Sequence, residues 1–316
     1  MNHLESSFSG KNNFWRYLLM ILAVLAASNT IGAIPLFIGV AARSSTDPHV
    51  ASRLALNPND LSVLGISQNA GFLLMLFPFL IALGTFILLI KPLNKRSLIA
   101  VINGTNSFRW NRMLISALVW AIFSAIYLFA YMKTDPSNFS LNNTGKTLIP
   151  LIIISVVCIP FQAAFEEIIF RGYLMQGFTV MVNNRFFPLI MTSLLFGLMH
   201  GMNPEVRDFG FWTMIPQYVL FGVIFGIMTV LDDGIETAIG AHAANNAFLC
   251  IMVTNDSSAL QTPAVFLQHK VYPWFEFSTM IIMGILIILV LNLIFKWNNF
   301  RTLFGRVSKS GMAYIP

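Results

Sequence analysis

Five ionisable side chains stand inside long apolar stretches of the sequence, where a charge is costly. They are Glu166, Glu167, Arg171, His200 and His242. A charge at the middle of a bilayer costs at least about 2.5–3.5 kcal/mol on insertion scales, so such groups persist where they face one another or a wet cavity. Carboxylates and imidazoles that converge in this way can take up and release protons, and they can activate a water molecule.

The two adjacent glutamates are expected to have different surroundings. Glu167 and Arg171 are spaced i, i+4 in the favourable order for an ion pair on one helical face. Glu166 lies about 100° around the same helix, so Arg171 is poorly placed to neutralise it. Glu166 is therefore the freer carboxylate and the candidate general base. For Glu167 and Arg171, a buried ion pair that only fixes the helix is an equally good interpretation.

A second pair of polar side chains, His242 and Asn246, also shares one helical face by its i, i+4 spacing. An imidazole and an amide one turn apart can donate hydrogen bonds to an oxyanion. The residues around them, 238–247, are mostly small, and the plainer interpretation is close helix packing with polar contacts. That interpretation explains the alanines and the glycine but not the histidine. Asn245 points in another direction and is the weaker candidate.

A lone histidine in an apolar helix is more often a satisfied core residue, so His200 needs a partner to carry function. Residue 183 lies midway between Glu166 and His200. A turn at Asn183 and Asn184 would fold the flanking helices into a hairpin and bring both side chains to the same depth. His242 falls within the first two turns of its own span, and we expect the three residues to lie in one layer.

Composition indicates which solvent surrounds these helices. The chain has 316 residues, of which 56% are hydrophobic and 10% charged, with a mean hydropathy of +0.72. Soluble domains carry about 25% charged residues, so this chain could not cover a water-facing surface. The net charge of +6 comes from Lys and Arg between apolar runs. They set orientation in a membrane, and nucleic-acid binding is not expected.

The fold class predicted is all-α, a polytopic integral membrane protein with about eight transmembrane helices. We place them at Tyr17–Val40, Ala70–Ile90, Leu114–Tyr131, Leu148–Val182, Phe187–Met199, Trp212–Leu231, Ile235–Val253 and Trp274–Phe295. The fourth is too long for a simple span, so a kink at Pro160 and an oblique last third are expected. Residues 1–147 would flank a core at 148–253, and 254–316 would add a loop, a last helix and a basic tail.

Charge outside the spans predicts orientation. The most basic connection, which holds Lys95 and Arg96, favours both termini on the cytoplasmic side, in a bacterial plasma membrane.

Asp232, Asp233 and Glu236 precede the seventh span, and we interpret them as solvated charges that favour a helix N-terminus. The two cysteines, Cys158 and Cys250, are isolated and are expected to be small core residues.

Three short motifs follow one another on apolar helices: Glu166-Glu167-x-x-x-Arg171, Phe196-x-x-x-His200 and His242-x-x-x-Asn246. In type and order they resemble the motifs of the CAAX prenyl protease type II and bacteriocin-processing family, known as CPBP or Abi-type proteases. The resemblance covers about a third of the chain. It implies an all-helical intramembrane endopeptidase of the glutamic type, in which Glu166 and His200 activate water while Glu167 and Arg171 support that site.

The same resemblance assigns His242 and Asn246 to stabilising the oxyanion. It also implies a peptide or protein substrate, which in this family can be anchored in the lipid bilayer. Eukaryotic members cut prenylated C-terminal tails, whereas bacterial members act on various peptides. CAAX processing therefore does not follow for this chain. No cofactor is implied.

Three alternatives stay open from the residues alone. Glu and two His are adequate zinc ligands, although the His-Glu-x-x-His motif of zinc proteases is absent from the sequence. The same polar cluster could serve as a proton relay or substrate site in a transporter, but we find no internal repeat of the kind that transporters often have. A catalytically idle scaffold or immunity protein would also fit.

Overall fold

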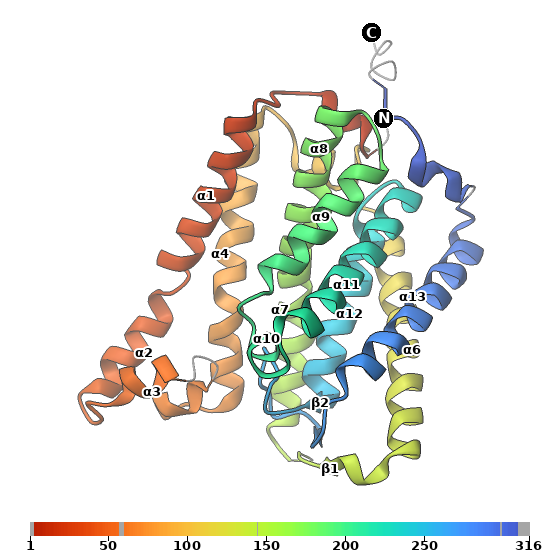
Figure 1. Ribbon diagram of the computed structural model, residues 1–316. Coiled ribbons are helices and arrows are strands. Elements are labelled where there is room, and N and C mark those ends of the chain that lie inside the picture. The colour runs from red at the N-terminus through yellow and green to blue at the C-terminus, as the bar shows by residue number, and fades with distance from the viewer. Residues whose placement is uncertain (1–2, 57–59, 144, 298, 309–316) are drawn as a thin grey trace.

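The computed structural model describes residues 3–56, 60–143, 145–297 and 299–308, and its long helices run side by side as one bundle (Figure 1). The longer helices are α1 (Phe14–Thr30), α2 (Ile34–Ser44), α4 (Gln68–Asn94), α6 (Trp110–Thr134), α7 (Leu148–Glu167), α8 (Met175–Val182), α9 (Phe186–Met199), α11 (Phe211–Asp232), α12 (Glu236–Met252) and α13 (Pro273–Phe295). Three short α-helices connect them: α3 (Val50–Leu56), α5 (Leu98–Ile102) and α10 (Pro204–Phe209).

The prediction of a polytopic helical membrane protein is confirmed. Six helical segments of the described chain are long and apolar enough to cross a membrane. They are Phe14–Ser44, Gln68–Asn94, Trp110–Thr134, Leu148–Val182, Phe211–Asp232 and Pro273–Phe295. Helices also occupy the other two predicted positions, but α9 has 14 residues and α12 has 17. The expected eight full spans are therefore six, together with two shorter helices.

Burial separates the inner helices of the bundle from those at its edge. In an apolar 18-residue stretch of α11, 56% of the residues are buried. In the corresponding stretch of the segment Phe14–Ser44, which holds α1 and α2, 11% are buried. Large apolar side chains such as Phe37, Leu88 and Phe129 stay exposed on the outer helices. Because lipid is as apolar as these side chains, the exposed surface is what a bilayer-embedded bundle requires.

A small sheet lies at the end of the bundle away from the two termini (Figure 1). Its strands are β1 (Phe139–Leu141), β2 (Val253–Thr254) and β3 (Phe266–Gln268), in the order β1-β3-β2. β3 pairs antiparallel with β1 and parallel with β2. The sheet thereby ties the connection between α6 and α7 to the connection between α12 and α13.

The fourth predicted span contains a change of helix type that the sequence did not indicate. Pro160 lies inside α7, which continues to Glu167. The backbone then becomes a π-helix over Ile168–Leu174 before α8 begins. π-Helices are rare, and they occur frequently at functional sites. The predicted hairpin is confirmed: Asn183 adopts a left-handed conformation with φ 54° that ends α8, and α9 returns from Phe186.

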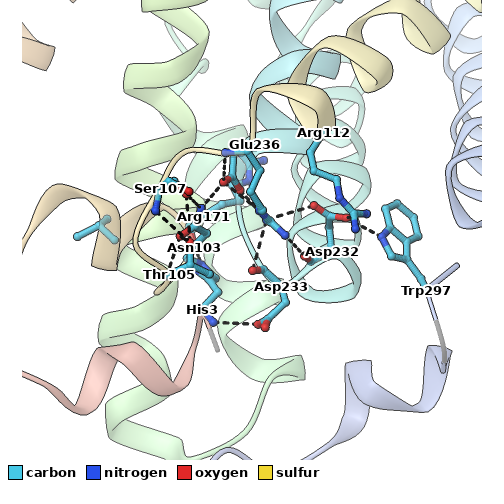
Figure 2. Close-up of polar contacts among 12 residues, drawn as sticks. His3, Asn103, Thr105, Ser107, Arg112, Arg171, Asp232, Asp233, Glu236 and Trp297 are labelled. Atoms are coloured by element: carbon cyan, nitrogen blue, oxygen red, sulfur yellow. Dashed lines mark hydrogen bonds and ion pairs between the residues drawn. The ribbon is translucent and has the colours of Figure 1, made fainter. Parts of the chain in front are cut away.

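The acidic residues before the seventh span are not solvated caps, so that prediction was wrong. Asp232 and Glu236 are 5% and 0% exposed. Arg109 lies 2.6 Å from Glu236 and 3.2 Å from Asp232, and Arg112 lies 2.7 Å from Asp232. Figure 2 shows this cluster, in which Asp232 also accepts a hydrogen bond from the Trp297 indole. Arg109, the N-cap residue of α6, and Arg112, in its first turn, are the two cations that make burial of the carboxylates possible.

Both described ends of the chain lie at one end of the bundle (Figure 1). Glu5 forms an ion pair with Arg185 at 2.5 Å, and the backbone of Arg306 forms an isolated antiparallel β-bridge with that of Asn184. The two ends therefore meet at the α8–α9 turn. Which side of the membrane this end faces remains a prediction from the charge pattern.

Gly240 allows α12 to approach α6 closely. A Cβ atom at this position would overlap the carbonyl oxygen of Met113 and the hydroxyl of Ser116. We expect Gly240→Ala to destabilise the protein by about 1–3 kcal/mol, because a rigid backbone atom stands in the way. Apparent melting temperature in detergent is the measurement. Gly84→Ala is the matched control, since nothing lies within 4 Å of its Cβ, and an equal drop in both variants would contradict the assignment.

The N-terminal segment docks on the bundle through a neutral histidine. His3 is 1% exposed. Its Nε2 lies 3.0 Å from the Arg171 carbonyl oxygen, to which it can only donate, and its Nδ1 lies 3.2 Å from the amide nitrogen of Gln176, from which it accepts. A second proton on the ring would remove that acceptor. Burial lowers the pKa of His3 to about 4. The hydrogen bond to the Arg171 carbonyl and the charge of Glu236 raise this pKa, whereas the charges of Arg96 and Arg109 lower it further.

Acidification is expected to weaken this docking. The folded state lowers the pKa of His3 from 6.5 to about 4. The unfolded chain therefore binds the extra proton first, and the stabilisation is complete above about pH 6.5 and lost as pH falls towards about 4. The loss is on the order of 3 kcal/mol. His3→Gln keeps a donor for the Arg171 carbonyl but does not titrate. Its melting temperature should fall less between about pH 7 and about pH 4.5 than that of the wild type, and equal falls would contradict the assignment.

Candidate active site

A cavity of about 600 Å³ opens between the inner helices of the bundle. Four of the six predicted site residues line it: Glu166, His200, His242 and Asn246. Glu167 and Arg171 lie behind its wall, and both are 0% exposed. The three residues expected in one layer, Glu166, His200 and His242, therefore line one cavity.

Glu166 presents one carboxylate oxygen without a hydrogen bond. It comes from the last turn of α7 and is 8% exposed. Its Oε1 accepts a hydrogen bond of 2.5 Å from Nε2 of Gln162, one turn earlier. Its Oε2 has no hydrogen-bond partner among the described residues and lies 3.6 Å from Nε2 of His242. A buried carboxylate oxygen beside a cavity can accept a proton from a bound water.

Glu167 holds His242 in place. Its Oε1 accepts from Nδ1 of His242 at 2.8 Å and from Nη1 of Arg171 at 2.9 Å. The i, i+4 pair with Arg171 forms as the sequence predicted. The Arg171 guanidinium also lies over the Phe196 ring at 4.3 Å. Because Nδ1 of His242 carries the hydrogen that Glu167 accepts, Nε2 is the nitrogen turned towards Glu166.

The ring of His242 is held by two aromatic rings and by the hydrogen bond to Glu167. It stacks on Phe225 with ring centres 5.0 Å apart, and Phe196 meets it edge-on at 5.9 Å. His242 enters from the second turn of α12, the helix that Gly240 brings against α6. The imidazole therefore has a defined orientation before any substrate binds.

His200 lies at the C-terminal end of α9 and is half-buried. Its Nδ1 is 2.7 Å from the Phe196 carbonyl oxygen, which can only accept, so Nδ1 carries the hydrogen. In the neutral ring Nε2 is then a free acceptor. The ring stacks on Tyr218 at 4.4 Å. No direct hydrogen bond joins His200 to Glu166 among the described residues, although both line the cavity.

Asn246 belongs to a chain of amides that the sequence did not reveal in full. Its Nδ2 donates to Oε1 of Gln162 at 3.0 Å, and its Oδ1 accepts from Nδ2 of Asn245 at 3.0 Å. Trp120 donates to Oδ1 of Asn245. Asn245, judged from the sequence to point elsewhere, thus supports Asn246 and also lines the cavity. Gln162 was missed, although its i−4 spacing from Glu166 was the available signal.

The site has no group of three His, Cys, Asp or Glu arranged to hold a metal ion within the described parts of the chain. Glu166 and His242 lie close enough to bind one metal ion, but the described residues place no third donor of a catalytic zinc site beside them. The role of zinc is tested by chelation.

Comparison with known proteins shows a similarity in the region that holds the candidate site. Residues 145–248, about a third of the chain, match the family model described as type II CAAX prenyl endopeptidase Rce1-like. The chain is also similar to the "Uncharacterized protein YyaK" of Bacillus subtilis (strain 168), with 26% identity over 280 residues that cover 87% of this chain and 90% of that protein. No solved structure matches the chain. All six predicted site residues lie within the matched segment, so the candidate site lies in the part of this polytopic membrane protein that is similar to the type II CAAX prenyl endopeptidases of the Rce1-like family.

Proposed function

We propose that this protein is an intramembrane endopeptidase in which Glu166 and His200 activate the water that cleaves a peptide bond. The observation that carries the proposal is that Glu166 lines the cavity while its buried Oε2 has no hydrogen-bond partner among the described residues. An orphaned carboxylate oxygen in such a place is stabilised by a bound water. The Rce1-like match supports peptide hydrolysis at the level of the family.

In the proposed reaction, water binds between Oε2 of Glu166 and Nε2 of His200. Glu166 takes one proton while the oxygen attacks the scissile carbonyl carbon, and the carbonyl becomes an oxyanion. Glu166 then returns the proton to the leaving amine as the C–N bond breaks. The free acceptor nitrogen of His200 suits it to orient the attacking water.

The developing oxyanion needs hydrogen-bond donors. We assign this role to His242 and Asn246. Asn246 uses one N–H for Gln162 and has a second to offer. Nε2 of His242 donates when the ring is doubly protonated, and Glu167 then balances its charge. Glu167 and Arg171 are positioning residues, because neither lines the cavity.

His200→Ala is the first test of the mechanism. We expect kcat for peptide cleavage by the purified protein in detergent to fall by about 10²-fold or more, since the water loses its second contact. His269→Ala is the matched control, because His269 is exposed and does not line the cavity. Unchanged cleavage in His200→Ala would remove this residue from the mechanism.

The same assay separates the glutamate mechanism from a zinc mechanism. Protein stripped with a chelator is expected to keep its activity. If activity disappears on chelation and returns with added zinc, Glu166 and the histidines act as ligands, and the proposal for water activation is wrong.

A further inference from the structure

The cavity that holds the proposed active site has a one-sided charge. Three carboxylates line it, those of Glu166, Glu205 and Glu276. No Lys or Arg belongs to its described lining, although the chain contains 19 Lys and Arg against 13 Asp and Glu. In a low-dielectric pocket an uncompensated charge of one sign selects ligands of the other sign. The charge of the cavity therefore runs opposite to that of the whole protein.

Glu205 comes from α10, next to the histidine that we assign to water activation. Its Oε1 accepts the backbone N–H of Ala259 at 2.8 Å, and it forms no ion pair with the described residues. Tyr218, which stacks on His200, lies beside it. Burial raises the pKa of Glu205. An ammonium or guanidinium group placed beside this carboxylate would offset the cost of its burial.

Glu276 lines the cavity from another element, the first turn of α13. Within the described chain its side chain accepts a hydrogen bond from Nε2 of Gln268 in β3, at 3.1 Å, and no cation pairs with it there. Tyr127 and Tyr131 lie near it and also line the cavity. Aromatic faces attract cations, so this part of the wall adds to the same preference.

The rest of the wall is apolar and rich in sulfur and aromatic rings. Among the residues that line it are Phe79, Phe209, Phe221, Met214, Met280 and Met283. Such a surface suits an apolar peptide segment, and methionine lets it adapt to different side chains. The occupant that fits both features is an apolar segment that carries a basic residue.

The same charge disfavours a substrate that is cut close to a free C-terminus. A terminal carboxylate within the cavity would meet three carboxylates and no Lys or Arg of the described lining. Recognition of a terminal carboxylate normally uses Arg, Lys or a group of backbone N–H donors. Cleavage at an internal bond avoids this repulsion.

Building on the proposed function, we propose that the substrate is a peptide or protein whose apolar segment carries Lys or Arg near the cleaved bond, with Glu205 and Glu276 as the carboxylates that bind the basic side chain. The cleaved bond is internal. Both glutamates are specificity-determining residues, and neither takes part in the proton transfers at Glu166.

Three matched sets of fluorogenic peptides test the proposal, with one apolar sequence flanked by Lys, by Gln or by Glu. In wild-type protein we expect kcat/KM for the Lys peptides to exceed that for the Glu peptides by about tenfold or more. Glu205→Gln and Glu276→Gln should each reduce this ratio several-fold. Asp256→Asn is the control, because it removes an exposed negative charge outside the cavity and should leave the ratio unchanged.

Binding provides a second readout that does not need turnover. Affinities of the same labelled peptides for the Glu166→Gln protein should follow the order Lys, Gln, Glu. If peptides are cleaved without a preference for Lys, the proposed function stands and the substrate proposal fails. If no peptide is cleaved but Lys peptides still bind more tightly, the proposed function fails and the charge selection stands.

Two further outcomes would overturn the substrate proposal. One is a preference for Lys that survives unchanged in both Glu205→Gln and Glu276→Gln. The other is faster cleavage of a peptide with a free carboxylate beside the cleaved bond than of its C-terminal amide. Two independent variants are used so that misfolding of one, seen in its melting temperature, leaves the other to decide.

Discussion

Replacing Glu166 by glutamine is expected to lower kcat for peptide cleavage by about 10²- to 10⁴-fold, because the general base is lost. The side-chain shape is kept, and the amide oxygen can still accept the hydrogen bond from Gln162. The fold should therefore survive. Initial cleavage rates of the purified protein in detergent measure the effect, and the apparent melting temperature verifies that the variant is folded.

The matched control for this variant is Asp208→Asn, which neutralises an exposed carboxylate. Among the described residues, the ion pair of Asp208 is with its neighbour Arg207. It should cleave at the wild-type rate. A Glu166→Gln protein that is folded and equally active would show that the orphaned oxygen in the cavity is not the base.

The second large effect is expected on stability. Arg171→Met removes the one guanidinium that pairs with Glu167 in the described structure, at a position where both side chains are 0% exposed. Breaking a buried pair from one side costs about 3–5 kcal/mol, because the remaining carboxylate loses its cation and keeps only the hydrogen bond from His242. Unfolding of the variant in detergent, followed by heat or denaturant, measures the loss.

The double variant Glu167→Gln/Arg171→Met separates charge from packing. It leaves no unpaired carboxylate at this point, so part of the lost stability should return. If the double variant is less stable than Arg171→Met by the full cost of a second lesion, the pair does not act as a unit. In that case packing of the Arg171 side chain on Phe196 would be the main source of its stabilisation.

Local rules were sufficient for the parts of the site that depend on one helix or one turn. The Glu167–Arg171 pair follows from i, i+4 spacing, and the hairpin follows from a turn at Asn183, whose left-handed backbone is well tolerated by asparagine. The cost of inserting a charge into a membrane then identified the ionisable residues that lie in or behind the wall of the cavity. Glu166 and His242 come from helices far apart in sequence, yet they approach to 3.6 Å.

The same cost argument could not find neutral partners or long-range ones. Gln162 and Asn245 carry no charge, so the cost of inserting a charge into the membrane did not identify them as site residues. Arg109 and Glu236 are 127 positions apart, and their pairing depends on how α6 meets α12. Without that packing, Glu236 looked like an exposed helix-capping carboxylate.

The π-helix in the fourth span shows another limit. Proline is the usual cause of a helix kink, and the kink expected at Pro160 stays a prediction. The π-helix begins after Glu167, where the sequence indicated no change of backbone. No residue type signals a π-helix, because the wider turn is stabilised by the packing and hydrogen bonds of its surroundings.

The central claim is that Glu166 and His200 act on one and the same water molecule. A double-mutant cycle on kcat/KM tests it directly, with Glu166→Gln, His200→Ala and the double variant beside the wild type. Residues that act as a unit lose nearly all their effect with the first substitution. We therefore predict that the double variant is about as slow as the slower single variant. Losses that multiply in the double variant would show that the two side chains act independently and would contradict the account.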